Sequence, residues 1–211
     1  MIESLIVPKN RLLCINESLN CQEAIQLLES NGLRCAPVLD ATNTIFRGNI
    51  YRYHIYQHKF RYPQADLSTI PVTHFLKNTT KVVRTSDSIL RLLFVINDLP
   101  HIAVLSVQNT FVGIIEHTDM MTFLAEAWLS DNAKYVLEVT AKGQVGELTK
   151  LIRLINRYTH IISSLTFENT KYGSESKFLF VLPSGFDIVE FNDLQRLLNR
   201  KQYKTKHYKM K

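Results

Sequence analysis

Residues 33–57, LRCAPVLDATNTIFRGNIYRYHIYQ, set a pattern that returns later in the chain. The apolar run Ala36–Leu39 is followed by the turn-forming residues Asp40–Asn43. A second apolar pair, Ile45–Phe46, then leads through Gly48 into an aromatic-rich segment. Short β-prone runs bounded by Asp, Asn and Gly indicate strands joined by a turn. The stretch therefore predicts the order strand, turn, strand, helix.

The same phrase returns at residues 99–124, LPHIAVLSVQNTFVGIIEHTDMMTFL. In this copy Val104-Leu105 takes the place of Val38-Leu39, Gln108-Asn109 that of Thr42-Asn43, and Phe111-x-Gly113 that of Phe46-x-Gly48. Leu39 and Leu105 are 66 positions apart, whereas Gly48 and Gly113 are 65 apart, so the second turn is one residue shorter. Two such copies predict a tandem repeat, which has to be recognised before any motif is interpreted.

Composition places the chain among globular proteins of the cytoplasm. It has 211 residues, of which 45% are hydrophobic and 21% charged, enough for one or two domains with a substantial core. No apolar run approaches the roughly 20 residues of a membrane span, and the N-terminus does not read as a secretory signal. Three cysteines, an odd number without a zinc-binding spacing, fit a reducing compartment and predict neither disulfides nor a metal site.

The net charge of +6 raises the question of nucleic acid as a partner. The excess is concentrated in residues 196–211, which contain seven Lys and Arg and no acidic residue. A basic end of this kind is more often a solvated strand and tail than a binding surface, so nucleic acid is the less favoured partner.

Each repeat is expected to contain a strand, a helix, two strands and a second helix. The first is predicted as strand 11–15, a helix beginning at Asn16–Ser18 and stopping at Asn31-Gly32, the two strands quoted above, and helix 52–60, followed by linker 61–68. The second is predicted as strand 81–84, a helix capped by Ser86–Ser88 and ending near Asn97-Asp98, strands 102–106 and 110–115, and helix 118–128.

After a boundary at Ser130–Asn132 the pattern changes. The remaining segments are predicted as strand 135–140, helix 145–158, strand 161–167, polar hairpin 168–176, strand 177–182, helix 187–199 and strand 203–209. The order β-α-β-β-α-β is that of a ferredoxin-like domain.

Residues 5–127 resemble a pair of CBS domains, also called a Bateman module. The resemblance rests on the element order of each copy, on Ala36–Asp40 before a tight turn, and on Gly48 or Gly113 before the last helix. Residues 134–211 resemble an ACT domain, through the ferredoxin-like order and Gly146–Leu148. The resemblance implies an α/β (α+β) protein with repeats at 1–68 and 69–129 and an ACT-like domain at 134–211.

The first part is similar to the cyclic-di-AMP-binding CbpB/DarB group among small bacterial regulators. The similarity includes the linker run Pro63–Val72 and the phrase Ile96–Asp98. It implies a homodimeric regulator that binds an adenine nucleotide, cyclic di-AMP before AMP or ATP. It further implies signalling to a target protein such as an alarmone synthetase or a metabolic enzyme, with no membrane partner and no cofactor.

The resemblance also implies which residues meet the ligand. By likeness to the dinucleotide-binding relatives, these are Arg11, Leu13, Leu33, Arg34, Cys35, His117, Thr118 and Asp119. Guanidinium groups suit a bridging phosphate because they pair with it bidentately. Two interpretations stay open for Arg11 and Arg34: they bind phosphate, or they are solvated residues at strand edges.

The nucleotide pattern of CBS domains, Gly-h-x-[Ser/Thr]-x-x-Asp, is incomplete in both copies. The second has Gly113 and Asp119 but places Glu116 at the hydroxyl position, where a carboxylate repels phosphate. The first has Gly48 but replaces the hydroxyl residue by Tyr51 and the aspartate by His54. The first copy is therefore expected to lack the usual contact with ribose.

Catalysis is not expected, because no nucleophile with a base, acidic dyad or Gly-rich phosphate loop stands out. His54 and His58 lie four apart, but no third metal ligand accompanies them. The ACT-like part keeps only the final glycine of an Asp-x-x-Gly turn, in Gly143–Gly146, and is expected mainly to dimerise. Two rival hypotheses remain: an interaction scaffold whose nucleotide site has decayed, and an amino-acid sensor acting through the ACT-like domain.

Overall fold

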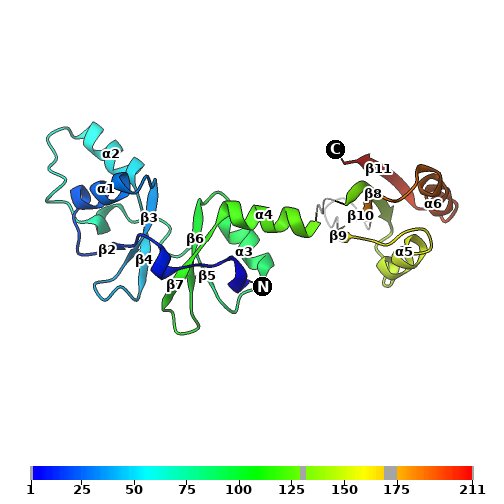
Figure 1. Ribbon diagram of the computed structural model, residues 1–211, viewed down its shortest axis with the longest axis horizontal. Helices are drawn as coiled ribbons and strands as arrows, with labels where there is room; N and C mark the ends of the chain where they lie inside the picture. The colour runs from blue at the N-terminus through cyan, green and yellow to red at the C-terminus, as the bar shows by residue number, and fades with distance from the viewer. Residues whose placement is uncertain (1, 129–131, 169–174, 211) are drawn as a thin grey trace. The chain divides into compact units, whose positions relative to one another are not determined.

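The computed structural model describes residues 2–128, 132–168 and 175–210, which form two compact units (Figure 1). The first unit comprises residues 1–121 and the second residues 122–211. The predicted boundary residues Ser130 and Asp131, and positions 169–174 of the predicted hairpin, lie outside the described residues. The domain limits 1–68, 69–129 and 134–211 stay a prediction.

The first repeat is a three-stranded sheet with two helices. β2 (Ile15–Asn16) runs parallel to β3 (Cys35–Leu39), and β3 pairs antiparallel with β4 (Phe46–Tyr51). Helix α1 (Cys21–Ser30) connects β2 to β3 and contacts α2 (Arg52–Arg61), which directly follows β4. The longer segment between α2 and β5, called the linker from here on, contains the short 3₁₀ helix η3 (Val72–Phe75). Pro37 lies inside β3, where its fixed φ suits an extended backbone.

The second repeat has the same order and a fourth strand. β5 (Val82–Arg84) runs parallel to β6 (His101–Leu105), and β6 pairs antiparallel with β7 (Phe111–Glu116). Helix α3 (Ile89–Ile96) connects β5 to β6, and α4 (His117–Trp128) follows β7. The fourth strand is β1 (Val7–Pro8) from the start of the chain, which lies between the 3₁₀ helices η1 (Ile2–Leu5) and η2 (Lys9–Arg11).

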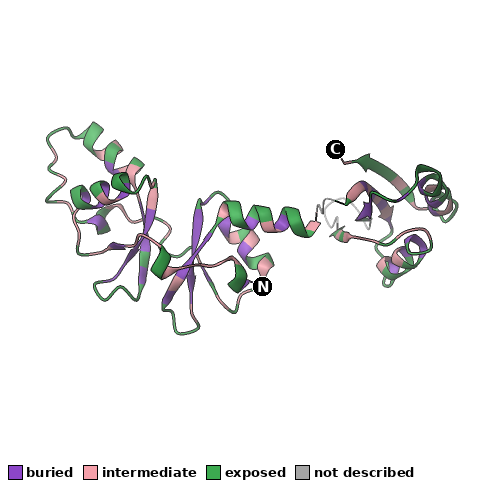
Figure 2. Ribbon diagram, in the orientation of Figure 1, coloured by how far each residue is buried: buried purple, intermediate pink, exposed green. Residues whose placement is uncertain are grey.

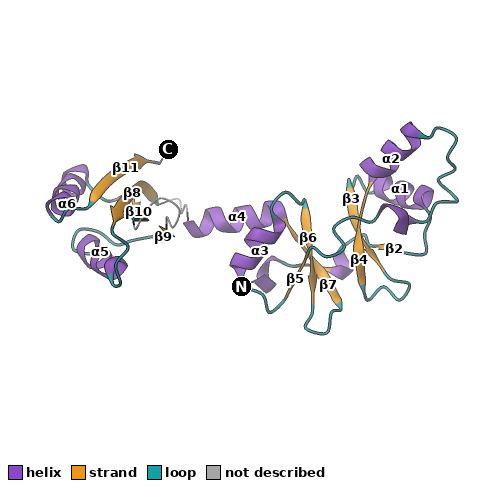
Figure 3. Ribbon diagram, turned by 180° about the vertical axis from the view of Figure 1, so that it is seen from behind, coloured by secondary structure: helices purple, strands orange, loops and turns teal. Residues whose placement is uncertain are grey.

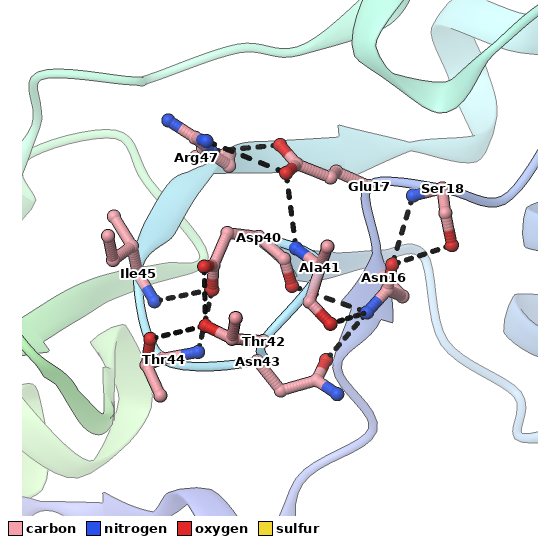
Figure 4. A network of polar contacts seen from close by, with 10 residues as sticks. All are labelled: Asn16, Glu17, Ser18, Asp40, Ala41, Thr42, Asn43, Thr44, Ile45 and Arg47. Atoms are coloured by element: carbon pink, nitrogen blue, oxygen red, sulfur yellow. Dashed lines mark hydrogen bonds and ion pairs between the residues drawn. The ribbon is translucent and has the colours of Figure 1, made fainter.

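The turns confirm the repeat at the level of single residues. Asn43 and Asn109 take the left-handed conformation at the same place in each hairpin, with φ of 56° and 62°, a conformation that Asn tolerates better than most side chains. Asp40 accepts hydrogen bonds from the N–H groups of Thr44 and Ile45, both at 2.7 Å (Figure 4). In the second turn, Ser106 replaces Asp40 and accepts two N–H groups through its hydroxyl.

The two repeats exchange short segments. β1 precedes the sheet of the first repeat in the chain but pairs with Gly113 and Ile114 in the sheet of the second, while Lys77, which lies between α2 and β5, bridges to Asn49 of the first sheet. At each of these two contacts, the incoming backbone lies close to a glycine of the other repeat. A Cβ on Gly113 would lie 2.2 Å from the carbonyl oxygen of Val7. On Gly48, which has φ +151°, a Cβ would lie 3.0 Å from the carbonyl oxygen of Lys77. The glycines of the CBS-like pattern thus permit close backbone approach.

The core of the first unit lies along the central strands, and β6 is buried over its whole length (Figure 2). One cluster belongs to the first repeat and includes Ile15, Leu28, Val38 and Ile50. Another joins the hairpins of both repeats, where the rings of Phe46 and Phe111 stack with centroids 5.9 Å apart. The repeats therefore share apolar core as well as backbone hydrogen bonds.

The second unit is ferredoxin-like. Its strands are β8 (Ala133–Ala141), β9 (Ser163–Glu168), β10 (Ser176–Pro183) and β11 (Lys204–Lys209), in the antiparallel order β11-β8-β10-β9. Helices α5 (Glu147–Ile155) and α6 (Ile188–Arg200) pack against the same face of this sheet (Figure 3). The predicted βαββαβ order is confirmed, and the basic strand β11 is largely exposed, as expected.

Two predictions about the first repeat are wrong. The chain is not a strand over 11–15, because it crosses from the sheet of the second repeat to that of the first and pairs only at Ile15–Asn16. Helix α1 is capped by Asn20, whose side chain accepts from Glu23 N–H in a capping box, and not by 16–18. Asn16 instead donates to the carbonyl oxygens of Asp40 and Ala41 and so holds the hairpin turn (Figure 4).

The other predicted elements exist, with ends that differ by a few residues, as helix termini commonly do. The largest difference is at α5, predicted over 145–158 and observed at Glu147–Ile155. Gly146 precedes it with φ +81°, a left-handed conformation that ends the loop and lets the helix begin one residue later. Ser88 caps α3 by accepting from Arg91 N–H, as predicted.

Candidate functional site

Three of the predicted ligand residues, Leu33–Cys35, lie at the start of β3, and a fourth, Leu13, packs against the same core cluster as Leu33. Leu13 and Leu33 are half-buried against the core of the first repeat, and Arg34 and Cys35 follow Leu33 directly. The carbonyl oxygen of Arg34 accepts a hydrogen bond from Arg52 N–H at 3.0 Å, which ties this segment to the first turn of α2. The Arg34 side chain is exposed, and within the described ranges no carboxylate forms an ion pair with it.

Three further predicted residues, His117, Thr118 and Asp119, form the first turn of α4. His117 N–H donates to the carbonyl oxygen of Pro100 at 2.9 Å, the counterpart of the bond between Arg52 and Arg34. Thr118 and Asp119 are exposed. The N-terminal turn of a helix offers free N–H groups and the positive end of the helix dipole. Both could meet an anionic ligand.

Arg11 is not on the same repeat as Arg34, the other arginine of the predicted set. It is the last residue of η2, which packs against β7 of the second repeat, and its side chain is exposed. Arg11 therefore belongs to the surface of the second repeat, and Arg34 to that of the first. The role of the predicted set in binding stays a prediction.

A buried polar network joins the two repeats at Cys35. The thiol Sγ of Cys35 lies 3.8 Å from Nδ1 of His101, and Nε2 of His101 lies 3.0 Å from Oδ1 of Asn49. Because an amide oxygen only accepts, Nε2 carries the proton and Nδ1 is left to accept from the thiol. Burial lowers the pKa of His101 to about 4 and raises the pKa of Cys35 to about 11. The pair is therefore a neutral hydrogen-bonded contact, not an activated nucleophile.

Tyr51 and His54, which replace the nucleotide-pattern residues of the first repeat, contact each other and the linker. Their rings meet edge-to-face with centroids 5.8 Å apart, and Tyr51 Oη accepts from Asn78 Nδ2 at 2.8 Å. Burial and the nearby Cys35 raise the pKa of Tyr51. Burial, followed by the charge of Lys77, lowers the pKa of His54. Neither side chain offers the carboxylate that would bind ribose hydroxyls.

Two cavities lie away from this predicted set. The smaller, of about 180 Å³, lies in the first repeat between α2 and the linker. The larger, of about 390 Å³, lies in the ferredoxin-like unit. It is lined by the end of β8, the start of α5 and the turn between α6 and β11, and includes Glu147 and Tyr203. Tyr203 Oη donates to Glu147 at 2.6 Å, and burial together with this bond raises the pKa of Tyr203 to about 12.

Sequence reasoning missed the network and the smaller cavity. The network left a usable signal, since His101 occupies in the second copy the position of Cys35 in the first. The smaller cavity left no such signal, because its walls combine α2 and the adjacent Tyr62 with Phe75 and Lys77, which lie more than ten positions beyond the helix. Among the described residues, no group of three or more His, Cys, Asp or Glu could hold a metal ion. None of the described helices combines the length and apolar character needed to cross a membrane.

No protein-family model and no curated protein matches the sequence. Solved structures do match in fold. A CBS-domain protein from Streptococcus pneumoniae matches with a TM-score of 0.55 at 20% identity, covering 62% of this chain and 89% of its own. The CbpB protein of Listeria monocytogenes in complex with c-di-AMP matches with a TM-score of 0.53 at 16% identity, covering 59% of this chain and 94% of its own.

A third solved structure is described as a CBS domain pair/ACT domain protein from Thermotoga maritima. It matches with a TM-score of 0.50 at 17% identity, covering 60% of this chain and 97% of its own. Identities of 20% or less support a shared fold but do not identify the ligand of this chain. The α/β chain has the fold of a CBS-domain pair followed by a ferredoxin-like domain.

Proposed function

We propose that this chain, with the fold of a CBS-domain pair, is a cytoplasmic regulatory protein that senses an adenine nucleotide and does not turn it over. Cyclic di-AMP is the first choice of ligand, with AMP and ATP next. The observation that supports this most strongly is the fold of the repeat pair, which a CbpB protein solved in complex with c-di-AMP also has.

The exposed charges of the repeats agree with an anionic ligand. Arg11 and Arg34 have no acidic partner among the described ion pairs, so each guanidinium can pair with a phosphate without first breaking a salt bridge. Asp119 is exposed in the first turn of α4, and its carboxylate would accept hydrogen bonds from ribose hydroxyls. Glu116 is exposed at the end of β7, where it can turn toward solvent and away from phosphate.

The test is calorimetric titration of the full chain with cyclic di-AMP, AMP and ATP, supported by thermal unfolding. A ligand present at about 100 times its dissociation constant adds about 2.7 kcal/mol to the free energy of unfolding. We expect cyclic di-AMP to raise the melting temperature of the first unit, and Arg34→Ala and Arg11→Ala each to weaken binding about tenfold, since hydrogen bonds to charged groups contribute about 1.5–3 kcal/mol.

Arg200→Ala is the matched control, because Arg200 is an exposed arginine at the end of α6 in the second unit. It should leave the affinity unchanged. If none of the three nucleotides binds, the sensing function is wrong, and the scaffold with a decayed site becomes the better description of the repeats.

Signalling requires a second protein and two arrangements of the repeats with different affinities for the ligand. We propose that the chain acts as a homodimer and that its target is a protein such as an alarmone synthetase or a metabolic enzyme. Sedimentation with and without cyclic di-AMP tests the first part. Affinity capture of partners that bind only the free or only the loaded form tests the second.

A second candidate function, amino-acid sensing by the ferredoxin-like unit, is favoured by the larger cavity. Lys142, Lys201 and Lys204 line it, as do the buried Glu147 and the exposed Gln144. Lysines could meet the carboxylate of an amino acid, and Glu147 its ammonium group. A panel of amino acids titrated into the wild type and Gln144→Trp tests this idea. Binding that the tryptophan abolishes would support it, and failure of every amino acid to bind would exclude it.

A further inference from the structure

The smaller cavity, in the first repeat, combines aromatic and basic side chains that the nucleotide hypothesis does not use. It has a volume of about 180 Å³ and lies between α2 and the end of the linker. Its lining residues are His54, Gln57, His58, Arg61, Tyr62, Phe75 and Lys77. His54 occupies the aspartate position of the nucleotide pattern, but none of the eight predicted ligand residues lines this cavity. Of the other residues, Gln57, His58 and Arg61 continue along α2, Tyr62 directly follows it, and Phe75 comes from η3.

Aromatic rings form the wall of the cavity. The ring of His58 meets Phe75 at 5.1 Å between centroids with an interplanar angle of 64°, and meets Tyr62 at 5.0 Å and 45°. Rings in edge-to-face and tilted contact leave faces and edges on which a further planar ring can pack. An apolar cavity of about 150 Å³ holds benzene, so this one has room for a six-membered ring with one substituent.

The charge of the cavity is positive. Arg61 and Lys77 line it, none of its lining residues is acidic, and α2 itself contains no Asp or Glu. Neither Arg61 nor Lys77 forms an ion pair within the part of the chain that the structure describes. Two cations without counter-ions in the lining of a small aromatic cavity favour a ligand that brings a negative charge.

Local hydrogen bonds fix the backbone at Lys77 and after Tyr62 before any ligand arrives. The backbone of Lys77 exchanges two hydrogen bonds with Asn49, at 2.8 and 2.9 Å. Lys59 Nζ donates to the carbonyl oxygens of Pro63 and Ala65, at 2.7 and 2.8 Å, and so fixes the turn that follows Tyr62. Such preorganisation lowers the entropy cost of binding.

We propose that this cavity binds a small aromatic carboxylate, with its ring against His58, Tyr62 and Phe75 and its carboxylate on Arg61 and Lys77. The site is separate from the predicted nucleotide residues and does not depend on the proposed nucleotide function. A carboxylate matches the guanidinium of Arg61 in a bidentate pair, and the ammonium of Lys77 adds a second contact.

The experiment is calorimetric titration of the full chain with benzoate as the probe. We expect saturable binding to one site. Arg61→Ala should weaken it about tenfold through the lost charged hydrogen bonds. Phe75→Leu, which keeps most of the side-chain volume, should weaken it through loss of ring packing. Lys77→Met provides a second test of charge that leaves the backbone contact to Asn49 in place.

Arg52→Ala is the matched control, since Arg52 is a cation of α2 that does not line the cavity. It should bind benzoate like the wild type, and so should Arg34→Ala, which separates this site from the nucleotide residues. Cyclohexanecarboxylate, with the charge but no planar ring, and benzamide, with the ring but no charge, should both bind more weakly than benzoate.

Three results would overturn the proposal. They are no binding at millimolar benzoate, binding that Arg61→Ala and Phe75→Leu both leave unchanged, and inorganic phosphate binding as tightly as benzoate. In the last case the cavity would be a simple anion site in which the rings have no part.

Discussion

His101 places an ionisable ring at the junction of the two repeats. It lies on the fully buried strand β6 of the second repeat and contacts Cys35 and Asn49 of the first. A charged imidazolium here would lose its hydration, and with Nδ1 protonated it could no longer accept from the thiol. The network is therefore intact only while His101 is neutral.

This gives a pH dependence with a defined sign. The folded-state pKa of His101, about 4, lies below the ordinary value of about 6.5. The contribution to stability is therefore full above pH 6.5 and is lost as the pH falls toward 4. Linkage predicts a loss of about 2 kcal/mol in the free energy of unfolding between pH 8 and pH 5.

Urea unfolding of wild type and His101→Gln at both pH values measures this loss. The glutamine variant should be less stable at pH 8 but should lack the part of the pH dependence that His101 supplies. Equal pH dependence in the two proteins would show that His101 is not the titrating group.

Gly113 is the second residue on which the junction depends. Gly113→Ala should lower the free energy of unfolding by about 2 kcal/mol or more, because the new Cβ meets the backbone of Val7 and that contact cannot be relieved by rotation of a side chain. Gly185→Ala is the control, since a Cβ there meets nothing within 4 Å. Circular dichroism during urea unfolding compares the two, and similar small losses in both variants would contradict the prediction.

At the scale of elements, the start of α1 offers a direct comparison of two candidate caps. Asn20→Ala removes the capping box with Glu23 and should cost about 1 kcal/mol. Ser18→Ala changes one of the three residues, Asn16–Ser18, at which the sequence predicted that the helix begins. Ser18 bonds only Asn16 in an exposed turn, so the change should cost a few tenths of a kcal/mol. Urea unfolding tests the order, and a larger loss at Ser18 would reverse the assignment.

The elements that sequence predicted well are those that local chemistry specifies. The hairpin turns could be predicted because Asn43 and Asn109 suit a left-handed conformation wherever they occur. The cap at Asn20 was missed because the polar run that begins at Asn16 offers several similar candidates, and packing chooses among them. β1 was missed because two residues, Val7–Pro8, carry no periodicity, and its partner strand lies in the other repeat.

The candidate sites divide in the same way. Residues near one another in sequence, such as Leu33–Cys35 and His117–Asp119, could be selected from motifs, and the structure keeps each group together. The cavity that contains Arg61 and Phe75 could not, because it exists only once the linker returns to α2. Tertiary structure creates such a site, and no local pattern encodes it.

At the scale of the whole molecule, the described apolar clusters divide between the two units. One cluster is formed by α5, α6 and the inner face of the ferredoxin-like sheet, with Phe180 fully buried at its centre. The others belong to the repeats and include the fully buried Ile50. Each unit therefore has its own source of stability.

Scanning calorimetry should accordingly distinguish two variants. Phe180→Ala should destabilise the second unit by about 4 kcal/mol, the usual cost of such a cavity, and leave the transition of the first unit in place. Ile50→Ala should act on the first unit alone, by about 3 kcal/mol. A single transition that both variants shift equally would show that the units unfold as one.

The exchange of segments between the repeats has a consequence for how the chain is made on the ribosome. Val7 is synthesised before its partner Ile114, which follows 107 residues later. Until β7 has left the exit tunnel, β1 has no strand to pair with, and the first repeat cannot form this contact with the second. The two repeats can therefore complete their folding only together. A chain truncated before Gly113 would leave the backbone groups of β1 without their partners in β7.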